Sequence, residues 1–150
     1  DVEAALAAVK TTADAAAVLN SRTITITHAD LTEVTNGVAQ SINLQAALPT
    51  PARVLFCELN RSGAGTPFTG GGVVTVALDV GGTDLDAIVA AEAVGPASAT
   101  TQRSGAAGIL PAGTFSGQQL KATFTPDAVN NLDELTAGSV EITVWYIGAA

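Results

Sequence analysis

The chain offers few side chains that could perform catalysis. It contains one histidine, His28, and one cysteine, Cys57. A Ser–His–Asp arrangement would have to use His28, but no Gly-x-Ser-x-Gly segment is present to expose a serine. Cys57 lies in the apolar run 54–57, which favours a buried thiol over a nucleophile. A zinc site built from histidine and cysteine is excluded, because one residue of each type cannot complete it.

Three carboxylates form the one candidate metal site. Asp79, Asp84 and Asp86 lie around a Gly-Gly turn, and calcium takes several oxygen ligands from loops of this kind. Their spacing matches no EF-hand loop, however, and Asp and Gly are also ordinary turn residues. The two interpretations of these residues remain open.

A second group of carboxylates resembles the acid–base pair of a glycosidase only in residue type. Asp127, Asp133 and Glu134 lie in a polar connection, and the chain has few aromatic residues that could stack on a sugar. No convergent set of catalytic groups is therefore evident. We expect no catalytic residues, no cofactor and no enzyme activity.

Charge limits the kinds of partner. The net charge of the chain is −8, and its basic residues, six in all, are scattered along the sequence. Nucleic-acid binding and a polybasic membrane site both need clustered Lys and Arg, so neither is expected. No apolar stretch approaches the ~18 residues that span a membrane. The first residues also lack the basic start and apolar run of an intact signal peptide.

The surface is expected to be polar but weakly charged. Charged residues make up 13% of the 150 residues, whereas about 25% is typical. Such a surface suits a protein that packs against copies of itself or against a large partner. A genome that favours Ala, Gly and Thr would produce the same composition.

Residues 1–20 differ from the rest of the chain. They are rich in alanine, and Val2, Leu6 and Val9 belong to one stripe at helical spacing. The stripe is made of small residues and would bury little area alone. We expect this segment to be a helix or arm that docks on the body or on a neighbouring subunit; a partly ordered tail is the alternative.

From residue 21 onward the apolar residues repeat with a period of two, which indicates half-buried strands. The strands are expected at residues 22–28, 38–44, 53–59, 73–80, 118–125 and 140–147. The run 53–59 is apolar on both faces and suits a strand covered on both sides. Residues 85–94 allow a short helix or an edge strand, 61–72 and 95–113 are expected to be loops, and 126–138 a connection.

Seven or eight short strands separated by Gly- and Pro-bearing loops are typical of an antiparallel β-sandwich or jelly roll. Strands and helices do not alternate along the chain, so a parallel α/β fold is not expected. We therefore expect an N-terminal arm at 1–20 and a β-sandwich domain at 21–150. Trp145 and Tyr146 are adjacent in the last strand and must point to opposite faces, one inward and one toward solvent or an interface.

Several strand segments resemble small structural proteins of tailed bacteriophages. These segments are Thr23-Ile24-Thr25-Ile26 with Asp30-Leu31-Thr32, Val76-Ala77-Leu78-Asp79-Val80-Gly81, Leu120-Lys121-Ala122-Thr123-Phe124-Thr125, Leu135-Thr136-Ala137-Gly138-Ser139-Val140 and Val144-Trp145-Tyr146-Ile147. They span roughly residues 22–147, and each uses common strand vocabulary.

The resemblance implies a virion component, and within that class it favours a capsid decoration (cement) protein. Such proteins are small β-domains, often trimeric, that bind the exterior of the assembled head through the major capsid protein. On this interpretation the contacts come from the arm and the loops, and the expected interface residues are Val2, Leu6, Val9, Phe68 and Trp145. A phage tail, neck or adhesion module remains an alternative, as does a secreted carbohydrate-binding β-sandwich.

Overall fold

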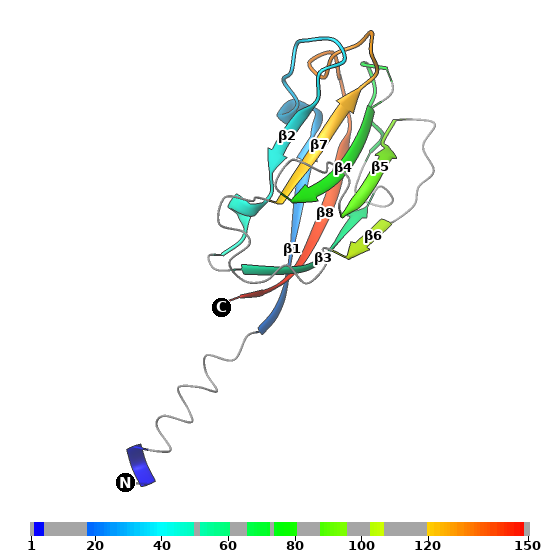
Figure 1. The fold of residues 1–150 in the computed structure, drawn as a ribbon. Helices are drawn as coiled ribbons and strands as arrows, with labels where there is room; N and C mark the ends of the chain where they lie inside the picture. Colours follow the sequence, from blue (N-terminus) through cyan, green and yellow to red (C-terminus); the bar gives the residue numbers. More distant parts are fainter. Residues whose placement is uncertain are drawn as a thin grey trace.

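A computed structural model shows how these segments are arranged. It describes residues 2–4, 18–49, 52–60, 66–72, 74–80, 88–95, 103–106 and 120–148. The strands are β1 (Val18–Thr27), β2 (Gln40–Asn43), β3 (Ala52–Asn60), β4 (Val74–Val80), β5 (Val89–Ala93), β6 (Arg103–Ala106), β7 (Leu120–Pro126) and β8 (Ser139–Gly148). Two short 3-10 helices, η1 (His28–Asp30) and η2 (Gln45–Ala47), follow β1 and β2 (Figure 1).

The strands form two antiparallel sheets of four strands each, in the orders β1-β8-β3-β6 and β2-β7-β4-β5. The first half of the chain pairs with the second half in reverse order: β1 with β8, β2 with β7, β3 with β6 and β4 with β5. A long antiparallel ribbon that is folded over in this way is a jelly roll. The expected antiparallel β-sandwich is therefore confirmed, with the jelly-roll strand order.

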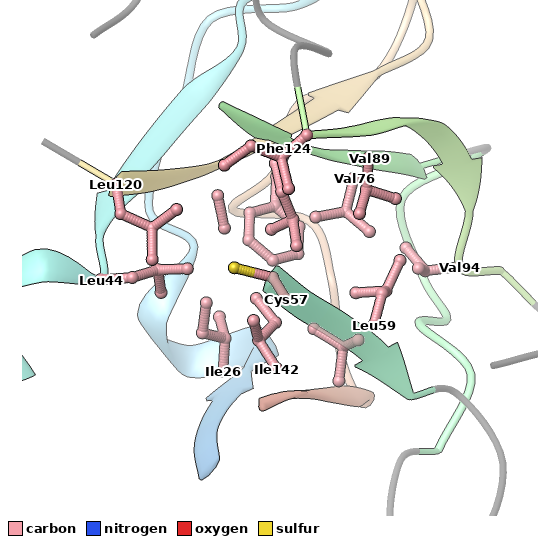
Figure 2. Close-up of a cluster of buried hydrophobic side chains, with 14 of the residues drawn as sticks. Ile26, Leu44, Cys57, Leu59, Val76, Val89, Val94, Leu120, Phe124 and Ile142 are labelled. Atoms are coloured by element: carbon pink, nitrogen blue, oxygen red, sulfur yellow. The ribbon is translucent and has the colours of Figure 1, made fainter. Parts of the chain in front are cut away.

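The core lies between the two sheets and is built from alternate residues of each strand. In β4 the inward residues are Val74, Val76 and Leu78, and in β7 they are Leu120, Ala122 and Phe124. Strand β8 contributes Val140, Ile142 and Val144. Residues of both sheets meet in this cluster, as Figure 2 shows around Cys57. The period-two pattern in the sequence thus marks the buried face of these strands.

Strand β3 departs from the expectation that it would be covered on both sides. It lies inside its sheet, between β8 and β6, but only its inner face meets the opposite sheet. A register shift between Val54 and Phe56 places Val54 and Cys57 on that inner face, although they are three positions apart. This bulge explains the continuous apolar run, because it breaks the alternation that a regular strand would show.

Three further boundaries differ from the expected ones. Strand β1 begins at Val18, so residues 18–20 belong to the sandwich, and Val38 lies outside β2 with 41% of its surface exposed. Strand β6 occupies part of the expected loop 95–113. For the segment 85–94, by contrast, the edge-strand alternative is confirmed, because β5 lies at the edge of its sheet. Residues 2–4 are helical and exposed, whereas 5–17 lie outside the described residues, so the arm stays a prediction. No helix in the described ranges is long and apolar enough to cross a membrane.

The core makes a direct prediction about stability. Phe124 is fully buried and packs edge-to-face on Phe68, with ring centroids 6.0 Å apart. Replacing Phe124 by alanine removes that contact and leaves a cavity, so the free energy of unfolding should fall by about 3–5 kcal/mol. Urea denaturation followed by circular dichroism measures this change.

Val129→Ala is the matched control, because Val129 is 74% exposed. Its substitution should change the free energy of unfolding by no more than about 0.5 kcal/mol. Equal losses in the two variants would contradict the assignment of Phe124 to the core.

Candidate functional site

His28 and Cys57, the two residues that could serve a nucleophilic mechanism, lie in different elements of the fold. Cys57 is fully buried among the core side chains, and burial raises the pKa of its thiol to about 12. His28 begins η1, and its backbone N–H donates to the Gly138 carbonyl at 2.9 Å. The thiol is therefore neutral at physiological pH, and a neutral thiol is a poor nucleophile.

The buried thiol leads to a second prediction. Ellman's reagent at pH 8 should not modify Cys57 in the native protein, because the raised pKa and the burial withhold the reactive thiolate. In denaturing urea one thiol per chain should react at once. Immediate reaction of the native protein would contradict the placement of Cys57 in the core.

The carboxylates of the suggested calcium site are not brought together by any described element. Asp79 lies in β4, paired in register with Lys121 of β7, while Asp84 and Asp86 lie outside the described residues. Across the described ranges, no cluster of three or more His, Cys, Asp or Glu residues could hold a metal ion. The choice between calcium ligands and ordinary turn residues therefore stays open for these three carboxylates.

Of the expected interface residues, Val2 is exposed at the surface but Phe68 is buried in the core. Val2 is 83% exposed, whereas Leu6 and Val9 lie outside the described residues. Phe68 was expected to contact a partner, but its side chain is fully buried. Gly138 allows this burial, since a Cβ atom there would lie 2.5 Å from the Phe68 Cα. Phe68 is therefore a core residue, and its side chain is not available at the surface.

Trp145 lies on the outer face of the β1-β8-β3-β6 sheet, as the alternation predicts, while Tyr146 faces inward. Its indole ring stacks on Phe56 of β3, with centroids 5.4 Å apart and an angle of 15° between the rings. In the neighbouring register position, Ile147 of β8 pairs with Leu19 of β1. We call Leu19, Phe56, Trp145 and Ile147 the outer patch.

The outer patch is only partly shielded from solvent. Leu19 is 57% exposed, and the other three side chains are half-buried. The indole N–H of Trp145 is buried yet has no hydrogen-bond acceptor within the described residues. A buried donor without an acceptor is unfavourable by about 1–3 kcal/mol. The patch therefore combines apolar area with one buried polar group that has no hydrogen-bond partner within the described residues.

A second exposed surface lies at the end of the sandwich where β1 and β7 finish. There the connections 31–39 and 127–138 are joined by hydrogen bonds: the Gly37 N–H donates to Asn130 O at 3.0 Å, and the Asn36 side-chain amide donates to Val129 O at 2.9 Å. Val34 and Val129 are nevertheless 67% and 74% exposed. We call this the loop end.

The loop end is acidic and internally ordered. Its carboxylates are Asp30, Glu33, Asp127, Asp133 and Glu134, and neither connection contains Lys or Arg. Several of them serve the local backbone: Asp127 accepts from the Val129 and Asn130 N–H groups, and Glu33 accepts from the Thr35 N–H at 2.9 Å. Hydrogen bonding to Thr35 lowers the pKa of Glu33.

Sequence reasoning missed Val34 and Val129 because neither lies in a periodic segment.

One open hollow of about 470 Å³ lies at the opposite end, beside Tyr146 near the end of β8. It is lined by η2 with the residues that follow it, and by Asn20, Arg22 and Tyr146 from β1 and β8. Arg22 is its one charged lining residue. Among its lining residues there is no acid–base pair and no nucleophile.

Comparison with known proteins adds information about the fold. No family model matches the chain, and no curated protein matches it. Among solved structures it is similar to a chain described as "Cyanophage Pam1 capsid asymmetric unit", with a TM-score of 0.54 and 18% identity. The likeness covers 87% of this chain and 85% of that chain, so the two are similar in length. At this identity the likeness concerns the fold.

Proposed function

We propose that this protein is a non-enzymatic structural component of a bacteriophage particle, and that within the particle it is a decoration protein on the exterior of the head. The observation that carries the proposal is the jelly roll, which a chain of similar length from a phage capsid asymmetric unit shares over 87% of this sequence. Jelly rolls are common in viral capsid domains. The burial of the Cys57 thiol in the core also fits a structural role for that residue.

The mechanism is linkage between binding and shell stability. A protein that binds the assembled, expanded shell and not its precursors stabilises that shell by mass action. Many copies act together, so each contact with the major capsid protein can be modest. The outer patch supplies apolar contact area, and the N-terminal arm extends the contact to neighbouring subunits.

The protein is expected to form a homotrimer that occupies three-fold positions of the shell. Light scattering should then give a mass of about three times the 14.9 kDa chain. A mass equal to one chain at all concentrations would remove the trimer from the proposal and raise the rank of a tail or glycan-binding module.

Binding to the head can be tested on phage particles that lack the protein. Purified protein should be added to these heads and to isolated tails, and its occupancy measured after sedimentation. We expect saturable binding to heads, no binding to tails, and release of DNA at a higher temperature from occupied heads. Binding to tails alone would overturn the assignment to the head.

The arm is tested by deleting residues 2–17 in the same assay. Occupancy at limiting protein should fall at least tenfold, because the deletion removes the contacts with neighbouring subunits. Replacing Val2 alone by serine is the matched control for a small change in the arm and should reduce occupancy less. Unchanged occupancy after the deletion would refute the role of the arm.

A further inference from the structure

The two sheets end in four edge strands that differ greatly in length. Strands β2 and β6 have four residues each and β5 has five, whereas β1 has ten. Short edges are one means by which proteins prevent unwanted strand pairing. Strand β5 also contains Glu92 and meets β4 at a register shift, and β6 begins with Arg103. Strand β1 is therefore the longest edge strand, and its length does not protect it against pairing with another strand.

Strand β1 also lacks the other features that protect an edge. It contains no proline, and Arg22 is its only charged residue. Its register with β8 continues without a bulge from Val18 to Thr27. Ser21, Arg22 and Thr23 are all exposed, although their side chains alternate between the two faces. The first half of β1 thus extends with the end of β8 beyond the cover of the other sheet (Figure 1).

The direction of the backbone groups follows from one hydrogen bond. The His28 N–H donates to Gly138 O, so residue 28 faces β8. In an antiparallel pair this orientation alternates along the strand, so the even-numbered residues of β1 face β8. The N–H and C=O groups of Leu19, Ser21, Thr23 and Thr25 therefore point away from the sheet. This outward row ends at Thr27, whose N–H is taken by the Asp30 carboxylate at 2.8 Å.

We propose that this outward row of β1 pairs with β1 of a second copy of the chain, in antiparallel orientation about a two-fold axis. An extended strand can pair with the whole row through backbone hydrogen bonds, and a second copy presents the same row in the complementary direction. Charge supports this partner. Two copies, each with a net charge of −8, repel one another overall. Strand β1, however, carries one cation and no carboxylate. Approach along β1 therefore meets less repulsion than approach at the acidic loop end.

The side chains select a pairing centred on Ser21. A centre at Arg22 would place the two guanidinium groups directly opposite one another, which is unfavourable. A centre at Thr23 would place Arg22 opposite Ile24. A centre at Ser21 instead places Arg22 opposite Asn20 of the other copy, which is polar and uncharged, so neither a like charge nor an apolar side chain faces the guanidinium group. The same register sets Leu19, which is 57% exposed, beside Thr23 of the second copy.

This inference goes beyond the proposed function and does not depend on it, because it is tested in solution without phage particles. In an array of decorating copies the same contact would link adjacent oligomers. Failure of strand pairing would leave head binding intact, and failure of head binding would leave strand pairing intact.

The register is tested by cysteine cross-linking. Under mild oxidation Ser21→Cys should form a disulfide-linked pair of chains, because a residue on the axis lies within disulfide distance of its own copy. Thr25→Cys is the matched control, since it lies on the same face of β1 but four residues from the axis, and it should not cross-link. The native Cys57 is buried and contributes no background. Equal cross-linking of the two variants, or none in Ser21→Cys, would overturn the proposal.

The backbone contact is tested by a second pair of variants. The mass of the wild-type protein in sedimentation should rise with concentration above its value at the lowest concentration. Ser21→Pro removes an outward N–H and should abolish this rise, whereas Ser21→Thr retains the N–H and should preserve it. Thermal unfolding of both variants checks that β1 still pairs with β8. An undiminished rise in a folded Ser21→Pro protein would rule out pairing through this edge.

Discussion

The placement of β8 between β1 and β3 is the interaction on which the rest of the structure depends. The last strand of the chain lies inside a sheet whose edge is the first strand, and Thr23 and Thr143 hydrogen-bond across this pair at 3.0 Å. Their separation of 120 positions means that the sheet closes only when both ends of the chain are present. Because long loops must close before such contacts form, a fold of this topology is expected to form slowly. The same strand order means that β1 pairs with β8 along one edge and with no described strand along the other.

The start of β8 organises the loop end as well. Gly138 precedes β8 with a φ of +128°, and a side chain there would collide with Phe68. Thr69 pairs with Ala137, so the segment 66–72 is fastened to the connection that leads into β8. The chain has only four Phe residues, so the core relies on the placement of each one. Burial of Phe68 under Gly138 thus connects the outer loops to the packing of Phe124.

The sequence predicts the fold where alternation is regular and fails where another constraint replaces it. The inward residues of β4, β7 and β8 follow the period of two, and Trp145 is correctly placed on the outer face. Strand β6 reads Arg-Ser-Gly-Ala and has no apolar residue larger than alanine, so nothing distinguishes it from a loop. The bulge in β3 hides which side of that strand is buried. Phe68 lies in a Gly-rich segment whose local pattern contains no sign of the glycine that covers it from a distant position.

The candidate surfaces were harder to predict because they depend on topology. Nothing in residues 18–27 indicates that they form an edge; that follows from the order of the strands in space. Likewise, the stacking of Phe56 on Trp145 requires two strands that are distant in sequence to be neighbours. The sequence alone assigns no structural role to Asp127 or Glu33, whereas the structure shows that both carboxylates order the local backbone.

The composition also restricts how this protein can recognise a partner. Charged residues make up 13% of the chain and aromatic residues 4%, whereas strong interfaces depend on a few buried Trp, Tyr and Arg anchors. The outer patch has one such anchor, Trp145, and it is already stacked within the fold. If the protein acts as proposed, its affinity would come from backbone hydrogen bonds along a strand edge, from broad apolar contact, and from the number of copies that bind together. A surface of this kind favours attachment to a repetitive lattice over tight binding of a single ligand, since only a lattice multiplies a weak contact.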